Sequence, residues 1–383
     1  MSRRNIPWCD ISFELMKNFL AFLRRETVFS AATLLAVVSA IAVPPDAGYL
    51  HYVDFRVLGI LLSLMMVMEG YKRIGLFQHM GRALLRRAST VRRLCITLIM
   101  LTFFGSMLVT NDVALITMVP FAMLVLSRSG NGRHLIRVIV LQTLAANLGS
   151  MLTPIGNPQN LYMYNLSGLS VTGFGAIMMP YCLVSFVMLA LCAFAFPSCK
   201  VEMTQEPESK PDVRLVAVYT LLFVLCLATV ARLVPFVVSL VMVIAVVWVV
   251  DRRIFVSVDY FLILTFVSFF VLTGNIQRIS GIRDFLCGIV SGNEVITGIA
   301  ASQIISNVPA ALLLSGFSGN VPALTVGVNL GGLGTLIASM ASLISYKFFA
   351  HSYNDAKGRY LGIFTMTNVI FLTALMICHW LMN

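Results

Sequence analysis

The sequence predicts an all-α integral membrane protein with an inverted repeat, two re-entrant hairpins and two broken helices, in about nine to eleven spans. The first reason is composition: of the 383 residues, 59% are hydrophobic and 11% are charged, and the mean hydropathy is +0.91. A soluble domain would not show these values. The second reason is a series of apolar segments, some interrupted by polar or helix-breaking residues, and the third is an internal repeat.

Charge and cysteine usage exclude several other classes. The net charge of +11 could suggest nucleic acid, but a basic excess in a membrane chain more often reflects basic cytoplasmic loops. We therefore expect no nucleic-acid partner. The eight cysteines are scattered without Cys-x-x-Cys or Cys/His metal spacing, so we expect neither a disulfide framework nor a metal site, and no cofactor.

Along the chain, the N-terminal stretch 1–26 carries Asp10, Glu14 and Lys17 among large apolar residues. This amphipathic pattern is too charged for a span, so we expect an interfacial helix on the membrane surface. Apolar segments follow, and a span needs roughly 20 such residues. The segments are 27–43, 55–69, 94–126, 135–164, 171–196, 215–231, 235–250, 258–275, 295–317, 321–349 and 361–381.

Loop charges indicate the orientation. With a cytoplasmic N-terminus and re-entrant hairpins at 92–127 and 293–317, 23 of the 27 Lys and Arg fall on the cytoplasmic side. The predicted outer loops 44–54 and 164–172 contain none, as the positive-inside rule requires. We therefore expect a multi-pass protein of the cell inner membrane with a polar cytoplasmic linker at 197–213.

Two stretches of the sequence recur. Residues 53–75 align without gaps on 258–280, and Asn147-Leu148-Gly149 aligns with Asn329-Leu330-Gly331. Because an odd number of crossings separates the first pair, the two halves should face opposite ways across the membrane. The predicted first repeat is 27–196, with a broken helix at 135–164, and the second is 214–383, with a broken helix at 321–349.

The segment 144–164 cannot remain one helix. Pro154 and Pro158 each remove a backbone donor and clash with the preceding turn, and Gly156 adds backbone freedom. A helix broken at membrane depth is tolerated only where its freed backbone groups are buried in protein or line a wet cavity. Transporter binding sites are commonly built this way. A simple proline kink is the alternative, but this break also contains three amide side chains.

The hairpin tips resemble those of the ion-transporter superfamily, which includes sodium-dicarboxylate symporters, citrate permeases, arsenite permeases and some sodium/proton antiporters. Each tip, Thr110-Asn111-Asp112 and Ser306-Asn307-Val308, is followed by a broken helix that begins Asn-Leu-Gly. The pattern is most similar to that of citrate-transporter-like and arsenite-permease-like permeases of the bacterial inner membrane, which share this break. The resemblance implies an inverted-repeat fold, a small-ion substrate and coupling cations held between tips and breaks, and a homodimer in the lipid bilayer.

The resemblance also implies site residues, for which oxygen ligands suit a hard cation such as sodium. Purely structural roles are the alternative, since tip residues can cap helices and the glycines can allow close helix packing. The substrate-binding candidates are Thr110, Asn111, Asp112, Asn157, Pro158, Ser306, Asn307 and Ser339. The ion-coupling candidates are Asn111, Asp112, Asn147, Thr153, Gly156, Asn307, Asn329 and Thr335.

Asp112 is the one carboxylate set deep in an apolar segment. It could merely cap the following helix. An ionised carboxylate at that depth is costly unless a cation or amides compensate it, so we expect it to hold a coupling cation or take up a proton. Dicarboxylate members of the superfamily show Ser-Asn-Thr at both tips, whereas this chain has Asp112 and Val308, a departure that argues against a citrate-like substrate.

These features predict secondary active transport of a small anion, an inorganic oxyanion or a carboxylate, coupled to sodium or protons. The alternatives are a sodium/proton antiporter and an arsenite-type efflux permease, with or without a separate ATPase subunit. A passive channel is a further rival. A membrane enzyme is disfavoured because all five histidines fall in loops or at segment ends, and no Gly-x-x-x-x-Gly-Lys-Ser/Thr phosphate loop occurs.

Overall fold

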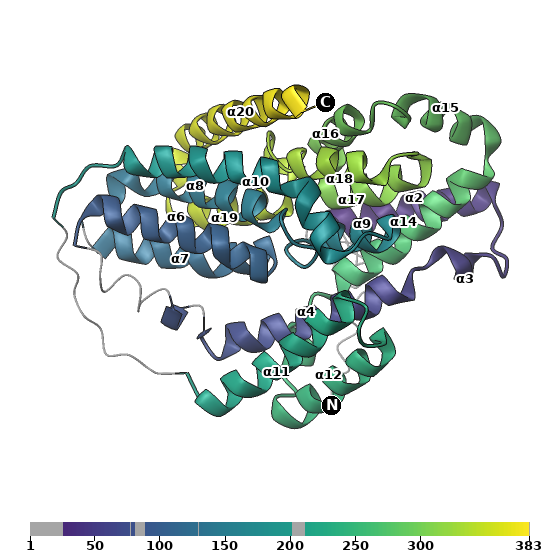
Figure 1. Ribbon diagram of the computed structural model, residues 1–383, viewed down its shortest axis with the longest axis horizontal. Helices are drawn as coiled ribbons and strands as arrows, with labels where there is room; N and C mark the ends of the chain where they lie inside the picture. The colour runs from purple at the N-terminus through teal and green to yellow at the C-terminus, as the bar shows by residue number, and fades with distance from the viewer. Residues whose placement is uncertain (1–25, 77, 81–88, 129, 201–210, 383) are drawn as a thin grey trace, which may run out of the picture.

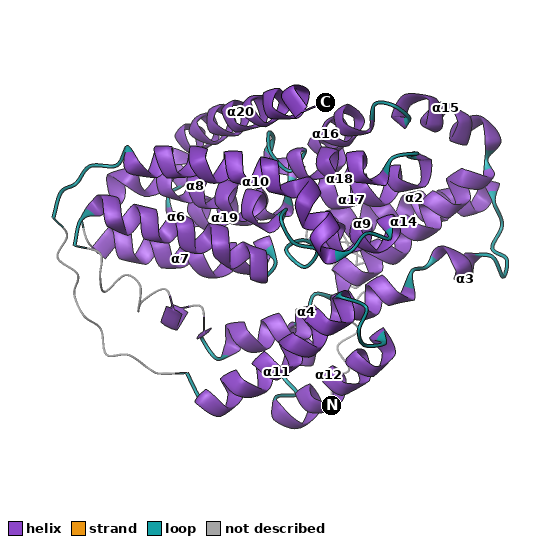
Figure 2. Cartoon of the chain, in the orientation of Figure 1, coloured by secondary structure: helices purple, strands orange, loops and turns teal. Residues whose placement is uncertain are grey.

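The computed structural model describes residues 26–76, 78–80, 89–128, 130–200 and 211–382 (Figure 1). Most of the predicted surface helix 1–26 and of the linker 197–213 lies outside them. The described residues are nearly all helical, and among them the only β-pairing is an isolated bridge between Thr90 and Lys200 (Figure 2). The all-α prediction is confirmed.

In the first half, two predicted segments each divide into two helices. The hairpin segment forms α6 and α7, which pack against each other and turn at Val109 and Thr110. The broken segment forms α8 and α9, and Pro158 begins α9, where its missing amide donor costs little. The helices are α2 (Thr27–Ala42), α3 (Tyr49–Tyr52), α4 (Phe55–Arg73), α6 (Val91–Leu108), α7 (Asn111–Arg128), α8 (Leu135–Ser150), α9 (Pro158–Ser167) and α10 (Val171–Phe194).

The second half follows the same plan with differences in detail. The hairpin is interrupted at Ser306, whose φ of 74° lies in the left-handed region. The sequence reading missed α15, which meets α16 at 111°. The helices are α11 (Val213–Val230), α12 (Phe236–Val250), α13 (Ile254–Ser257), α14 (Tyr260–Arg278), α15 (Ser280–Val290), α16 (Glu294–Ile305), α17 (Asn307–Leu314), α18 (Val321–Leu330), α19 (Met340–Ser352) and α20 (Lys357–Met382).

Five described helices are long and apolar enough to cross a membrane alone, and a sixth span results if the bent pair α15 and α16 counts as one. The five are α6, α10, α11, α14 and α20. Five shorter apolar helices fall below this length test. Three of them, α7, α17 and α18, are arms of hairpins or halves of broken helices, and the other two are α2 and α12. The chain is a multi-pass membrane protein.

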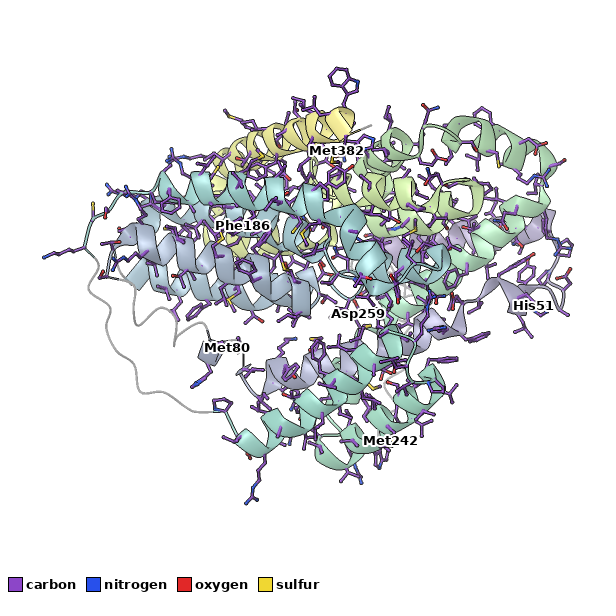
Figure 3. All side chains as sticks on the ribbon, in the orientation of Figure 1. His51, Met80, Phe186, Met242, Asp259 and Met382 are labelled. Carbon is purple, nitrogen blue, oxygen red and sulfur yellow. The ribbon has the colours of Figure 1, made fainter. Side chains whose placement is uncertain are left out.

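The outer surface is apolar, as contact with lipid requires. Met242 on α12 and Met382 on α20 point outward and are 49% and 45% exposed (Figure 3). His51 lies at the outer edge of the molecule in the same view, in the short helix α3.

The sequence repeat is also a repeat of local structure. The elements α2, α3 and α4 recur as α12, α13 and α14, and α3 and α13 are each four residues long and 205 residues apart. Asp54 caps α4 by accepting a hydrogen bond from the Val57 amide, and Asp259 caps α14 by accepting one from the Leu262 amide. The same side chain thus begins the matching helix in each half.

The first helix of each matching unit packs against the other unit. In both Figure 1 and the tertiary contacts, α2 packs against α14, while α12 packs against α4 beside α11. Arg278 at the end of α14 pairs with Asp46 after α2 (2.8 Å), and Arg73 at the end of α4 pairs with Asp251 after α12 (2.7 Å). The 205-residue offset relates both acids and both arginines. Each half is therefore completed by a helix of the other.

Candidate functional site

The first hairpin tip is attached to the first helix break through Asn111. Its backbone amide donates to the Gly156 carbonyl (3.0 Å), and its side-chain Nδ2 donates to Oδ1 of Asn147 on α8 (3.0 Å). Its Oδ1 accepts from the Asp112 amide (2.9 Å). Asn111 is therefore the first residue of α7 and connects the tip to α8 and to the break.

The first break is held open by its own polar residues. Asn157 Nδ2 donates to Ser150 Oγ (2.7 Å), and Asn160 Nδ2 donates to the Ser150 and Thr153 carbonyls (3.1 and 3.2 Å). A side chain on Gly156 would overlap the Ser150 carbonyl. The Thr153 hydroxyl donates to the Met107 carbonyl (2.7 Å) on the hairpin, so this hydroxyl is already engaged by a protein acceptor.

Asn147 joins the two halves of the molecule. Its Oδ1 also accepts from Ser339 Oγ (3.0 Å), and its Nδ2 lies within hydrogen-bonding distance of the Gly332 carbonyl (3.4 Å) and Ser342 Oγ (3.5 Å). Those three residues belong to the second broken helix. Ser339 and Asn147, predicted as separate substrate and ion ligands, are therefore in direct contact.

A second hydrogen bond joins the two halves, and it involves the Asn-Leu-Gly motif of the second half. Asn329 on α18 donates from Nδ2 to Oδ1 of Asn160 on α9 (2.7 Å). Asn147 and Asn329 are 182 residues apart, and so are their partners Asn160 and Ser342. The register that aligned the two Asn-Leu-Gly motifs thus also relates the two crossing contacts.

The second tip meets the second break less closely. Ser306 Oγ lies 3.5 Å from both Asn307 Oδ1 and the Ala338 carbonyl. The buried Asn307 lies with its Nδ2 3.0 Å from the position that a Cβ on Gly332 would take. Since Asn147 also reaches the Gly332 carbonyl, the asparagines of both halves converge on Gly332.

One predicted ligand does not join this cluster. Thr335 is exposed, its amide donates to Gln303 Oε1 (2.9 Å) and its hydroxyl donates to the Gln303 carbonyl (3.2 Å). Gln303 also donates from Nε2 to the carbonyls of Gly331 and Leu333 (both 2.9 Å). The sequence reading missed this glutamine, whose only signal was an amide in an apolar hairpin arm four residues before Asn307.

Several buried polar atoms beside the first break have no hydrogen-bond partner among the described residues. They are Oδ1 of Asp112, Oδ1 of Asn157 and both side-chain polar atoms of Gln159. The backbone hydrogen bond between Asn111 and Gly156 joins the residues that directly precede Asp112 and Asn157 in the chain. A buried polar group without a partner costs about 1–3 kcal/mol, so a group of them calls for a ligand, an ion or water. Gln159 was not among the predicted site residues.

The surrounding electrostatics combine helix ends with neutral side chains. Four helices begin at the tips and breaks: α7 at Asn111, α9 at Pro158, α17 at Asn307 and α19 at Met340. Each N-terminus carries about half a positive charge. Among the described residues, Glu294 (6% exposed) is the only charged residue that is buried as a whole, and no lysine or arginine is buried. The site can therefore offer amides and helix ends to an anion, and oxygens to a cation.

Comparisons with known proteins agree with this architecture. The citrate transporter family matches residues 16–322. The inner membrane protein YbiR of Escherichia coli is 33% identical over 337 residues, which cover 86% of this chain and 89% of that protein. An uncharacterized transporter of Methanocaldococcus jannaschii is 33% identical over 338 residues, covering 86% and 91%. A silicon efflux transporter of Oryza sativa subsp. japonica is 32% identical over 179 residues, covering 46% and 36%.

Proposed function

Because the chain belongs to the citrate transporter family, we propose that this membrane transporter moves a small anion by secondary active transport, coupled to sodium or protons. The observation that carries the proposal is the group of unpartnered polar atoms on Asp112, Asn157 and Gln159, next to the contact of hairpin tip and broken helix. In a transporter, such polar atoms would gain their partners only while the transported ions are bound.

The cation would bind on the first-half side of the site. Asp112 Oδ1, Asn157 Oδ1 and Gln159 Oε1 are oxygen atoms of the kind that hard cations prefer. A proton on Asp112 would serve the same end by removing its charge. Either cation would make the interior more favourable for an anion, which the N-termini of α7, α9, α17 and α19 would attract.

A second candidate is efflux of an uncharged weak acid. It is favoured by the lack of a buried lysine or arginine among the described residues, since a dianion or trianion has no fixed countercharge there. A relative of part of this chain is named a silicon efflux transporter. This candidate uses the same tips and breaks but requires no charge balance for the substrate.

The deciding experiment uses purified protein in proteoliposomes. A panel of radiolabelled solutes (carboxylates, sulfate, phosphate and arsenite) is offered under a sodium gradient, a proton gradient or neither. The proposal expects one anion to accumulate against its gradient only when a cation gradient is imposed. Accumulation of an uncharged weak acid alone would favour the second candidate. Equilibration without accumulation for every solute would indicate a channel and contradict the proposal.

We also propose an inner-membrane location, a cytoplasmic N-terminus and a homodimer. Orientation rests on the distribution of Lys and Arg in the sequence. Labelling of cysteines introduced at Ser167 and Arg214 from one side of intact cells tests it, because the charge distribution puts the two positions on opposite faces. Mass measurement of the detergent-solubilised protein tests the dimer.

A further inference from the structure

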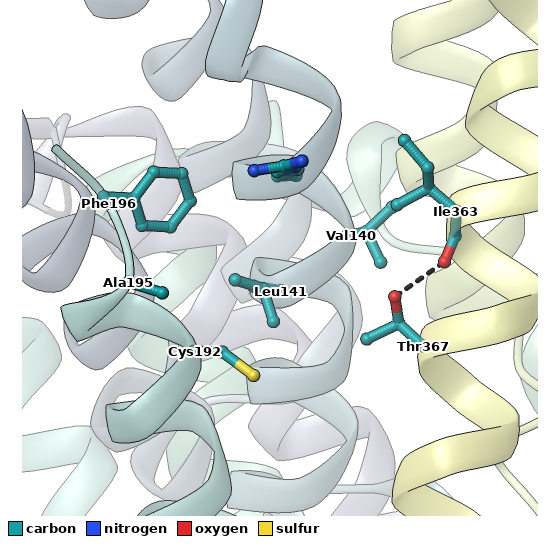
Figure 4. Close-up of a pocket in the computed structure, with 8 residues that line it drawn as sticks. Val140, Leu141, Cys192, Ala195, Phe196, Ile363 and Thr367 are labelled. Carbon is teal, nitrogen blue, oxygen red and sulfur yellow. Dashed lines mark hydrogen bonds between the residues drawn. The ribbon is translucent and has the colours of Figure 1, made fainter.

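A cavity lies between α8, α10 and α20, apart from the hairpin tips. Its volume is about 230 Å³, and Figure 4 shows its apolar walls. The Thr367 hydroxyl donates to the Ile363 carbonyl (2.6 Å), so it offers no free donor, and Arg137 is the only charged residue of the lining. The lining residues are Arg137, Val140, Leu141, Cys192, Ala195, Phe196, Ile363 and Thr367.

Besides Arg137, which lines the cavity, two arginines contact the lining residue Phe196 or its ring neighbour His134. Arg137 is exposed in the first turn of α8, where the positive end of the helix dipole disfavours a cation and favours an anion. Arg92 donates to the carbonyl of Phe196 (2.8 Å), which lines the cavity, and Arg133 donates to His134 (3.0 Å). No described carboxylate pairs with any of these three arginines.

His134 adds no charge to this end of the cavity at neutral pH. Its ring packs edge-on against Phe196 at 5.7 Å. Burial, followed by the charges of Arg133 and Arg137, lowers the pKa of His134 below its ordinary value of 6.5. The cation charge is therefore carried by guanidinium groups alone.

The cavity is bordered by surfaces that face lipid. On α10, Leu191 and Phe194 are 66% and 59% exposed, and on α20 Met366 is 68% exposed. Ala195, between these faces, is exposed as well. An apolar chain could thus enter from the bilayer, while a free inorganic anion would have no use for the apolar walls.

We propose that this cavity binds one anionic phospholipid, with its phosphate on Arg137 and part of an acyl chain along Val140, Leu141 and Ile363. Basic pockets between membrane helices at the cytoplasmic surface are suited to acidic lipid head groups. Arg133 and Arg92 add to the attraction for a negative head group. Burial of acyl methylenes in the cavity adds affinity that a soluble phosphate lacks.

The test is native mass spectrometry of the purified full-length protein in neutral detergent, titrated with phosphatidylglycerol or phosphatidylcholine. The wild type should bind phosphatidylglycerol more tightly. Arg137→Gln should weaken phosphatidylglycerol binding about five-fold, the effect of one basic residue near a membrane surface. It should weaken phosphatidylcholine binding less, because that lipid has a phosphate but no net negative charge. Ala195→Phe, which fills the cavity from an exposed position, should weaken both lipids. Arg214→Gln, an equal charge loss at the start of α11, should change neither.

Two outcomes would overturn the proposal. One is a phosphatidylglycerol preference that survives both Arg137→Gln and Ala195→Phe in protein with the wild-type thermal unfolding midpoint. The other is full displacement of phosphatidylglycerol by inorganic phosphate in an Arg137-dependent manner, which would identify a free-anion site. Partial rescue of phosphatidylglycerol binding by Arg137→Lys supports the charge requirement.

Discussion

The two hairpin tips share a backbone plan but differ in how they are attached. Asn111 at the first tip makes three hydrogen bonds of 2.9–3.0 Å, to the break, to α8 and to its own helix. Among the described residues, the side chain of Asn307 at the second tip has one hydrogen-bond contact, at 3.5 Å, with Ser306. The next residue is Asp112 in the first tip and Val308 in the second. Of the two tips, only the first therefore carries an ionisable side chain.

The two breaks also differ in which residues hold them. Asn157 and Asn160 tie the first break to Ser150, within the same segment. The second break is held from outside by Gln303 of the hairpin arm. A repeated backbone has thus been stabilised by different side chains, which teaches that symmetry of helix breaks does not imply symmetry of ligands. The predictions below compare matched positions in the two halves.

The largest effect is expected at the paired glycines Gly149 and Gly331. A methyl group on Gly149 would overlap the Phe103 carbonyl, which is part of a helix backbone, whereas on Gly331 the nearest atom is Ser302 Oγ at 2.6 Å. Overpacking costs about 1–3 kcal/mol, and Gly149→Ala should reach or exceed the top of that range. Thermal unfolding in detergent should show a larger loss for Gly149→Ala than for Gly331→Ala. Equal losses would contradict the difference in packing.

The next largest effect is expected at Asp112, the ionisable residue of the first tip. Asp112→Asn keeps most of the capping capacity but removes the charge, so the protein should fold, insert and lose most cation-coupled uptake or change its pH dependence. Val308→Asn at the matched position should retain coupling, and Asp284→Asn, an exposed carboxylate on α15, serves as the control. Normal uptake with an unchanged pH profile in Asp112→Asn, alongside low yield of Asp112→Ala, would leave Asp112 as a cap only.

A third comparison concerns the hydrogen bonds that hold the two breaks. Gln303→Leu removes the donor to two carbonyls and the acceptor for the Thr335 amide, a loss of about 2–4 kcal/mol at about 1 kcal/mol or more per bond. Thr153→Val removes one donor, to the Met107 carbonyl, at a cost of about 1 kcal/mol. Hydrogen exchange read by mass spectrometry should rise strongly at 331–339 in Gln303→Leu and weakly at 151–157 in Thr153→Val. The reverse order would show that the first break depends on its tie more.

The crossing pairs should show smaller effects. A double-mutant cycle on Asn329 and Asn160, joined at 2.7 Å, should give a coupling energy of about 1 kcal/mol. The cycle on Asn147 and Ser342, at 3.5 Å, should give less than about 0.5 kcal/mol, because the hydrogen bond is long. Unfolding in denaturant measures both, and a larger coupling for the second pair would refute this ranking.

The smallest effects belong to the exchanged ion pairs, which are partly exposed. The hydrogen bond from Arg278 holds the pKa of Asp46 below its ordinary value of 3.8. A lowered acid pKa stabilises the folded protein above the unfolded pKa, and this stability is lost as the pH falls through the folded pKa. Asp46→Asn should therefore matter little at neutral pH and not at all in acid or high salt. A loss that persists in high salt would point to a structural role for this pair instead.

The sequence by itself determined where helices break. Pro154 and Pro158 lack backbone donors wherever the chain places them, and Asp54 and Asp259 cap the helices that follow them through bonds three residues away. Apolar segment lengths in turn predicted the membrane class. These features depend on neighbours along the chain, so sequence patterns carry them.

Only the tertiary structure decided which polar groups meet. Asn147 could have paired with any buried hydroxyl, yet it joins Ser339, 192 residues away, while Thr335 is drawn to Gln303 instead of Asn329. The packing of the two halves likewise decides that α2 lies against α14 and α12 against α4. It also leaves the side-chain amide of Gln159 without a hydrogen-bond partner among the described residues. The contact of Asn147 with Ser339 joins residues 192 positions apart, and that of Thr335 with Gln303 joins residues 32 positions apart. Energies of about 1 kcal/mol for each contact are too small to shape a local pattern.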